Sequence, residues 1–404
     1  MNSLQTAFYV SIISLFLLPR NVMAQDSLLV RLAIENQKEF NLENNKFHGE
    51  GWEYIKSKTI NSKNILVGED HFSNEIPVFV KALTDITSFD NFYIEVDPYS
   101  TRILEKSLKE YSDSERQKFN AVYGELFSFY SMEPEYKLLE HIANNGINLL
   151  GSDQIVMYAD RLIVQDLMTR SKNPSAKEIY SKIIEKSLIE FERFHEVTKN
   201  PLTMYFMTSE FLDDINKLEA LVLSEEEDMI IADMKESVTI YKEQNHRKRV
   251  RLILNQLMKD YPEWKNSKNL FKYGANHMAR GESFLTTFDI GNMVANITES
   301  NYQESFHIMI IGESGALGSP FKSFPPNPID IENGFYLSYL KPFFNITKGT
   351  NWKMFNLIPL RKRVERRKLQ LDNINLLRVI KGFDILVIVP EVTPAKLLTI
   401  PNNK

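Results

Sequence analysis

Six short and almost uninterrupted apolar runs constrain the fold of this chain more than any other feature. Each run consists mostly of Ile, Leu, Val and aromatic residues and ends in, or close to, a glycine or an acidic residue; the runs are Asn64–Gly68, Asn91–Val96, Ile147–Gly151, Leu270–Gly274, Phe306–Gly312 and Phe383–Val389. Runs of this length are typical of strands that are buried on both faces of a sheet. Helical patterns lie between them, as in the apolar positions 76, 79, 83 and 86. Strands that alternate with helices predict an α/β fold with a mainly parallel central sheet flanked by helices.

One interval between two of these runs is much longer than the others. Residues 155–266 contain no convincing strand, and their apolar residues recur at helical spacing, for example at positions 211, 215, 218 and 222. This periodicity predicts helices that bury one apolar stripe. We therefore expect a single α/β domain over residues 25–404, with a helical insertion over about 155–266 that could form a lid or a wall over the sheet.

The first 24 residues do not belong to this pattern. The apolar run Ala7–Leu18 is 12 residues long, whereas a helix needs about 20 residues to cross a bilayer. Val22 and Ala24 then provide the small residues of a cleavage site, although no Lys or Arg precedes the run. We interpret residues 1–24 as a signal peptide, with an N-terminal anchor or a buried helix as the alternative. The mature protein is expected to be secreted, periplasmic or extracellular, without an integral membrane span.

The chain contains no cysteine, and its charges are nearly balanced, with 48 Lys and Arg against 53 Asp and Glu. Disulfides, thiolate nucleophiles, iron–sulfur clusters and a cysteine-linked lipid anchor are therefore not expected, and a metal site would have to use His, Asp and Glu. A slightly acidic chain is a poor general binder of nucleic acid, so we expect no nucleic-acid partner. The basic stretch 361–368 is interpreted as a solvated helix face or turn, with contact to anionic lipid or a polyanion as the alternative.

Two of the predicted strands are followed by the same short motif. Gly68-Glu69-Asp70-His71 follows the first strand, and Gly274-Ala275-Asn276-His277 follows a later one, so both have the pattern Gly-x-x-His. The glycine permits a sharp turn, and the histidine is expected at the C-terminal edge of the sheet, where open α/β folds bind ligands. Two imidazoles directed at one crevice can act as acid and base or bind a metal.

Carboxylates follow the same strand ends. Glu69 lies inside the first motif, Glu95 ends an otherwise apolar strand, and Asp153 follows the next strand. A carboxylate in such a place is unfavourable unless it faces a polar site or has a partner. Although each signal alone is common, their joint occurrence predicts one functional site that contains His71 and His277.

Other polar residues are weaker candidates. Arg280 could steady a developing oxyanion, and His246 and Arg247 could reach the site from the helical insertion. Ser314 stands in Gly-Glu-Ser-Gly, which approximates a nucleophile elbow. Serine hydrolases of the α/β class keep the chain order serine, acid, histidine. The last histidine here, His307, precedes Ser314, so this alternative is set aside and Ser314 is expected in a tight loop.

The segments NILVGEDHFSNEIPVFVKAL, NFYIEVD, NLLGSDQ, LFKYGANHMARGES and FDILVIVPEVTPAKLL together resemble the superfamily of erythromycin esterases, haem-binding iron-uptake lipoproteins and Tiki metalloproteases. The resemblance implies that Glu69, His71, Glu95 and His277 are site residues, and the Tiki-like branch implies a divalent metal on His71, Glu95 and His277. Only one residue separates Glu69 from His71, which is closer to the iron-uptake and Tiki-like branches than to the esterases. No second histidine stands near His277, and the lipoprotein cysteine is missing.

These observations predict a secreted hydrolase that cleaves an ester, lactone or amide bond in a small-molecule or peptide substrate. His71 or His277 would act as general base on water, or both would ligate a metal that activates it, while Glu69 and Glu95 orient the imidazoles, exchange protons or act as a further ligand. The sequence does not name the cofactor: a divalent metal ion is one expectation and haem a lesser one. The alternatives are an uptake protein that binds haem or metal without turnover and a non-catalytic interaction protein.

Overall fold

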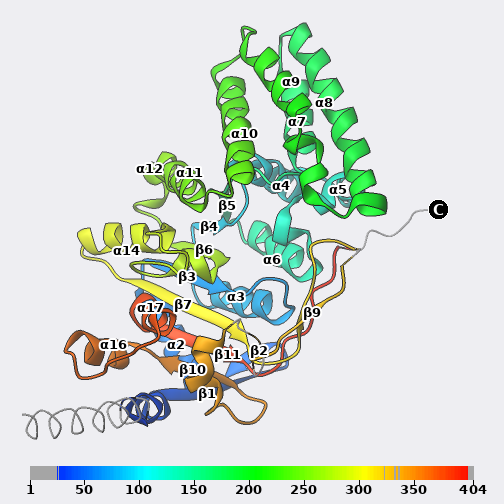
Figure 1. Ribbon diagram of the computed structural model, residues 1–404. Coiled ribbons are helices and arrows are strands. Elements are labelled where there is room, and N and C mark those ends of the chain that lie inside the picture. The colour runs from blue at the N-terminus through cyan, green and yellow to red at the C-terminus, as the bar shows by residue number, and fades with distance from the viewer. Residues whose placement is uncertain (1–24, 26, 323, 332–333, 335–336, 399–404) are drawn as a thin grey trace, which may run out of the picture.

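The computed structural model describes residues 25, 27–322, 324–331, 334 and 337–398. The segment 1–24, interpreted above as a signal peptide, lies outside these residues. Figure 1 shows a twisted central sheet with helices packed around it and a group of helices projecting to one side. Among the described residues, none of the helices combines the length and the apolarity that a bilayer crossing requires.

The central sheet has nine strands in the order β2-β1-β10-β11-β7-β3-β6-β4-β5. Their bounds are β1 (Gln37–Glu43), β2 (Lys46–His48), β3 (Asn64–Glu69), β4 (Asn91–Ile94), β5 (Asn148–Gly151), β6 (Asn269–Gly274), β7 (Ser305–Gly312), β10 (Trp352–Asn356) and β11 (Ile385–Val389). The strands from β11 to β5 pair in parallel, whereas β10, β1 and β2 extend the sheet antiparallel. A separate small ladder joins β8 (Ala316–Leu317) to β9 (Asn327–Pro328). The predicted α/β fold with a mainly parallel sheet is confirmed.

All six predicted strands are present as the parallel strands. Their side chains alternate between two hydrophobic cores, as the two-residue period of a strand requires. In β3, for example, Ile65 and Val67 belong to one core and Leu66 to the other. Because both faces are buried, these strands contain no alternation of polar and apolar residues.

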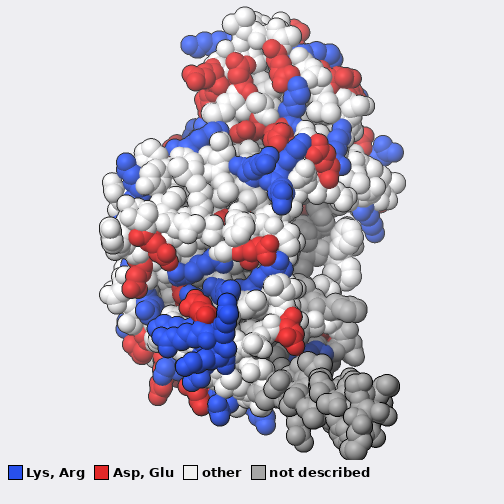
Figure 2. Space-filling model, turned by 60° about the vertical axis from the view of Figure 1, so that its left-hand side comes forward, with Lys and Arg blue, Asp and Glu red and all other residues white. Residues whose placement is uncertain are grey.

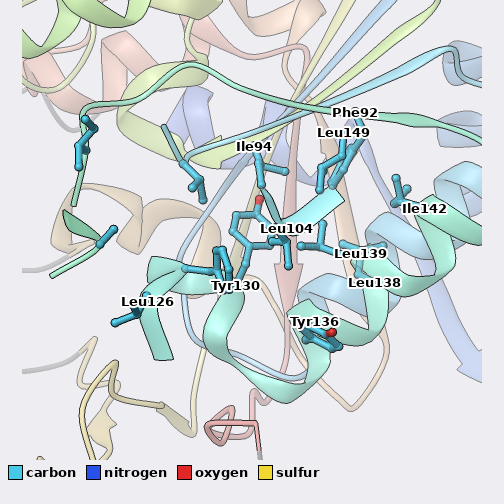
Figure 3. Packing of buried hydrophobic residues seen from close by; sticks show 14 of the residues in the cluster. Phe92, Ile94, Leu104, Leu126, Tyr130, Tyr136, Leu138, Leu139, Ile142 and Leu149 are labelled. Carbon is cyan, nitrogen blue, oxygen red and sulfur yellow. The ribbon is translucent and has the colours of Figure 1, made fainter. Parts of the chain in front are cut away.

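Helices cover both faces of the sheet. One face packs against α2 (Glu50–Asn61), α3 (Glu75–Ile86), α4 (Pro98–Glu110) and α6 (Glu133–Asn144). The other face packs against α11 (His246–Lys259), α13 (Ala275–Met278), α14 (Ile290–Ser300), α15 (Lys341–Phe344), α16 (Ile358–Glu365) and α17 (Ile374–Gly382). Figure 3 shows part of the first core, where Phe92 and Leu149 of two strands meet Leu104 of α4 and Leu139 of α6.

All the regular secondary structure between β5 and β6 is helical. It contains α7 (Asp160–Arg170), α8 (Pro174–Arg193), α9 (Ser209–Glu219), α10 (Glu225–Glu243), α11 and α12 (Tyr261–Trp264). Figure 1 shows α7 to α10 as the green group that projects beyond the sheet. Their apolar stripes join the first core, because Leu162, Tyr180, Phe211 and Ile230 belong to it. The helix α11 returns to the sheet and packs on the opposite face.

The basic stretch 361–368 lies on α16 and the turn that follows it. Most of its cationic side chains are exposed, and Arg361 is partly buried against the carboxylate of Asp384. In the view of Figure 2, Lys and Arg gather on the lower part of the molecule, with Asp and Glu beside them. The stretch is therefore a solvated helix end and turn, as its sequence predicts.

Candidate active site

Three neighbouring parallel strands, in the order β3-β6-β4, end at the candidate site. Glu69 is the last residue of β3, and His71 follows two residues later. Glu95 comes directly after β4. Gly274 ends β6 and leads into the short helix α13, which carries His277. The shared C-terminal edge of the strands therefore brings together four of the residues that the sequence predicts.

Glu95 lies at the centre of this group. One of its oxygens is 3.3 Å from Nε2 of His71, and the other is 3.4 Å from Nε2 of His277. The backbone N–H of Gly274 donates a hydrogen bond of 2.7 Å to the first oxygen. A single buried carboxylate thus joins the two Gly-x-x-His motifs.

The glycine of each motif leaves space for a residue of the other motif. A Cβ at Gly274 would lie 2.9 Å from Nε2 of His71, and a Cβ at Gly68 would lie 2.9 Å from the Cα of Ala275. Contacts this short do not occur between real Cβ atoms and their neighbours. The repeated glycine therefore permits the close approach of the two strand ends, in addition to any turn it allows.

His71 is held between two carboxylates and an aromatic ring. Its Nδ1 lies 2.8 Å from Glu69, and its ring stacks on Phe129 with centroids 3.6 Å apart and an interplanar angle of 7°. Burial opposes the charged imidazolium, but hydrogen bonds and charge from Glu69 and Glu95 outweigh it and raise the pKa of His71 to about 9. The imidazolium is therefore the dominant form at neutral pH.

His277 has the same kind of environment at a deeper position. Its Nδ1 lies 3.0 Å from Asp289, the residue that caps α14, and its side chain is 3% exposed, against 19% for His71. Burial again opposes the charged form, but the charges of Glu95 and Asp289 and their hydrogen bonds raise the pKa of His277 to about 10. In turn, burial of Glu95 is outweighed by His277 and His71, so its pKa lies well below the usual range.

One buried and one partly buried cation, neither of them predicted from the sequence, complete the charge balance. Lys272 of β6 is fully buried and binds Glu69 at 2.6 Å and Glu135 of α6 at 2.7 Å. Arg249 of α11 binds Glu95 at 2.7 Å and Asp153 at 2.5 Å. Lys272 had a signal in the sequence, because it is a charged residue within an apolar strand.

The helical insertion contributes to the site through one face of α11. His246 and Arg249, one helical turn apart, face the strand ends, whereas Arg247 is exposed. The ring of His246 lies 5.8 Å from that of His277, and burial together with the positive charge of His277 lowers its pKa. The expectation for His246 and Arg247 is therefore corrected to His246 and Arg249, because residues three apart share a helix face.

Arg280 does not lie at this site, which corrects its proposed role as an oxyanion partner. Its guanidinium binds the carboxylate of Asp384 at 2.6 Å and the carbonyl of Ser305 at 2.7 Å. Ser305 begins β7 and Asp384 directly precedes β11. Arg280 is therefore at the opposite edge of the parallel strands. The chain reverses direction after α13, which sequence spacing alone does not reveal.

Ser314 and His307 are also apart from the site. The hydroxyl of Ser314 donates to the carbonyl of Pro390 at 2.7 Å. His307 is buried within β7, and Nδ1 of its ring faces the carbonyl of Met278 at 2.7 Å. Burial lowers the pKa of His307 to about 3, so it stays neutral.

The donor set His71, Glu95 and His277 does not fit a metal ion or haem in this arrangement. All four ring nitrogens of the two histidines face carboxylate oxygens, and the raised pKa values favour protonated rings, which have no lone pair to offer. Glu95 is further occupied by Arg249 and Gly274. Within the described ranges of the chain, no group of three or more His, Asp or Glu has an arrangement that could hold a metal.

Comparison with known proteins gives a likeness of fold. No family model and no curated protein matches the sequence. A mutant of the erythromycin esterase EreC in its open conformation superposes with a TM-score of 0.58 at 12% identity, over 90% of this chain and 99% of that one. A Bacillus cereus protein gives 0.54 at 14% identity over 93% and 99%, and a succinoglycan biosynthesis protein gives 0.54 at 12% identity over 92% and 99%. The chain therefore has the fold of the erythromycin esterases, as its strand-end motifs predict.

Proposed function

We propose that this protein hydrolyses an ester or lactone bond of a small molecule, with His71 as the group that transfers protons. The observation that carries the proposal is the bridge that Glu95 makes between Nε2 of His71 and Nε2 of His277 at the C-terminal edge of the sheet. Buried acid–base groups with strongly shifted pKa values are typical of catalytic sites. Such a pair can exchange protons with water and with a leaving group.

His71 is the better placed of the two histidines for this task. Its side chain is 19% exposed, whereas that of His277 is 3% exposed. Its short contact to Glu69 through Nδ1, at 2.8 Å, keeps a proton on that nitrogen, while the contact of Nε2 to Glu95 is longer, at 3.3 Å. When Nε2 has lost its proton, it is the nitrogen that can accept one from an approaching water.

The proposed reaction then proceeds in two steps. Neutral His71 takes a proton from water as the water oxygen bonds to the substrate carbonyl carbon, and the imidazolium returns that proton to the leaving oxygen as the bond to carbon breaks. His277 and Arg249, both bound to Glu95, keep its carboxylate in position and balance its charge. An amide substrate would follow the same course with a nitrogen leaving group.

The proposal predicts a rate that increases with pH. The base must be unprotonated, and the pKa of His71 is raised to about 9. We expect kcat/KM for a neutral ester to increase about tenfold per pH unit below this value and to level off above it. A profile that is already flat from neutral pH upward would show that His71 is not the base.

The direct test is a panel of aryl esters and lactones assayed with the wild type and with His71→Asn. We expect hydrolysis by the wild type and a loss of about 10²- to 10⁴-fold in kcat for the variant, which is the usual contribution of a general base. His141→Asn is the matched control, because His141 of α6 is a partly buried histidine that contacts Thr84 and Asp85 of α3. Equal activity of the two variants would contradict the proposal.

Metal analysis and absorbance spectra of the same samples test the remaining alternatives. Binding of a divalent metal or haem by the wild type, lost in the double variant His71→Ala/His277→Ala, together with no hydrolysis of any ester, would replace the proposal with an uptake or storage role. Secretion of the mature protein, residues 25–404, is part of the proposal.

A further inference from the structure

A cavity lies outside the candidate active site, between α5 (Asp113–Tyr123) and α8 of the helical insertion. Its volume is about 720 Å³, which is within the usual size range of small-molecule sites. Its lining includes Tyr123, Phe191 and Leu188, together with Arg161, His195 and Lys322. Glu69, His71, Glu95 and His277 do not line this cavity.

Arg161 is the unusual member of this lining. Arg161 is only 5% exposed, and its Nε is buried without a hydrogen-bond partner. No carboxylate in the described part of the chain forms an ion pair with its guanidinium. The neighbouring Asp160 is turned toward the hydroxyl of Ser187, at 2.6 Å, and burial raises the pKa of Asp160 to about 6. A buried guanidinium without such a partner is costly unless a ligand supplies the anion.

Two aromatic rings lie close to this guanidinium. Its carbon lies 5.5 Å from the ring centroid of Tyr123 and 5.2 Å from that of Phe191. Cation–π contacts of this kind stabilise the cation without using its N–H groups. These contacts therefore do not occupy the N–H donors of Arg161.

The other charged groups of the cavity are Lys322 and three carboxylates, those of Glu125, Glu192 and Glu196, and none of these carboxylates forms an ion pair with Arg161 among the described residues. Lys322 is paired with Glu125, while Glu192 and Glu196 are exposed at the rim. Nε2 of His195 is buried without a hydrogen bond and lies 3.9 Å from the carboxylate of Glu125. Burial lowers the pKa of His195, so its imidazole is neutral at pH 7. His195 belongs to a π-helical segment, Phe194–Thr198, a rare conformation that is frequent at functional sites.

We propose that this cavity binds a small amphipathic carboxylate, whose charged group is held by Arg161 and whose apolar body lies between Tyr123, Phe191 and Leu188. A planar guanidinium can form two parallel hydrogen bonds to a carboxylate. His195 supplies a further hydrogen-bonding nitrogen. The inference is independent of the hydrolase proposal, because the two sites share no residue.

Isothermal titration calorimetry with two probes of the same shape tests the inference. Naphthoate carries the carboxylate, whereas naphthylmethanol has the same rings and no charge. We expect the wild type to bind naphthoate about tenfold to a hundredfold more tightly than naphthylmethanol, and Arg161→Met to abolish this preference. Arg193→Met is the matched control, because Arg193 lies on α8, is exposed and pairs only with Glu190 among the described residues. It should retain the wild-type preference.

A second variant keeps the test decisive if Arg161→Met does not fold. Leu188 lines the cavity and is 42% exposed, so Leu188→Trp can fill the apolar part without disturbing the buried core. We expect naphthoate binding to weaken at least about tenfold in this variant. No binding of naphthoate by the wild type, equal binding of the two probes, or unchanged affinity in Leu188→Trp would each overturn the inference and leave Arg161 as a structural cation between two rings.

Discussion

At the scale of single residues, the candidate site is a set of charges removed from water and balanced against one another. Lys272 is fully buried in the central strand β6, between Glu69 and Glu135. The charge of Lys272 helps to keep the pKa of Glu69 low despite its burial, whereas burial dominates at Glu135 and raises its pKa to about 7. The ion pair with Glu69 in turn supports the contact of Glu69 to His71. Lys272 is thus linked to His71 through the carboxylate of Glu69.

Replacement of this lysine should be strongly destabilising. Lys272→Met leaves the carboxylates of Glu69 and Glu135 buried without their cation, and the free energy of unfolding is expected to decrease by about 3–5 kcal/mol. Glu135→Gln is the control, and we expect a smaller loss because the pKa of about 7 means that Glu135 is already partly neutral. Urea unfolding followed by circular dichroism measures both. Equal losses would show that Lys272 is not the residue that balances this pair.

The two motif histidines should also make stability depend on pH. Their pKa values are raised from 6.5 to about 9 for His71 and about 10 for His277, so the folded protein holds these protons more tightly than the unfolded chain. The resulting stabilisation is fully present below pH 6.5 and is lost as the pH increases through about 9 and 10. Urea midpoints of the wild type should therefore decrease across this range more than those of His71→Asn/His277→Asn. Parallel curves would contradict the raised pKa values.

At the scale of elements, the site depends on how closely two strand ends can approach. Gly274 has an ordinary negative φ of −55°, so alanine is compatible with its backbone. A Cβ there would nevertheless lie 2.9 Å from Nε2 of His71 and 3.5 Å from Glu95. At Gly68, by contrast, a Cβ would meet Ala275 and Met278 in the core between β3 and α13. The same residue type therefore has a different task in each motif.

This difference predicts that alanine at one glycine lowers mainly kcat, whereas alanine at the other lowers mainly stability. Gly274→Ala should displace the ring of His71, which is partly exposed and can move, and reduce kcat of the proposed hydrolysis at least about tenfold with a change in stability below about 1 kcal/mol. Gly68→Ala should overpack the core and cost about 1–3 kcal/mol of stability. Thermal unfolding and ester assays of both variants measure the contrast. A purely structural role of both glycines would instead give two equally destabilised variants.

The parallel strands could be predicted from the sequence because burial on both faces removes polar residues from them. The same principle explains why β1, β2 and β10 could not be predicted, because they extend the sheet at its edge. In β1, for example, the sequence Gln37–Glu43 (QKEFNLE) is mixed, and only Phe40 is buried. At the site, the strand-end residues were predictable because they follow Gly or an apolar run. The position of Arg249 was not predictable, because it depends on how α11 returns to the sheet. Arg280 was predicted at the site but lies elsewhere, because the chain reverses direction after α13.

At the scale of the whole molecule, the sheet and the helical insertion form one structure rather than a core with a loose addition. The first hydrophobic core continues from the strands into α7 to α10, and α11 crosses to the other face and places Arg249 on Glu95. The insertion therefore contributes both to folding and to the charge balance of the site.

The segment 1–24 predicts that the protein is exported and cleaved. Cleavage after Ala24 would remove Arg20, leave 380 of the 404 residues and change the formal net charge from −5 to −6. When the full chain is expressed in a bacterium with a periplasm, we expect the periplasmic protein to have the intact mass of Gln25–Lys404, because a signal peptidase needs a small residue before the cleaved bond. Ala24→Tyr blocks that position and should leave the uncleaved chain at the membrane. Full-length wild-type protein in the cytoplasm would instead show that the apolar run Ala7–Leu18 has another role.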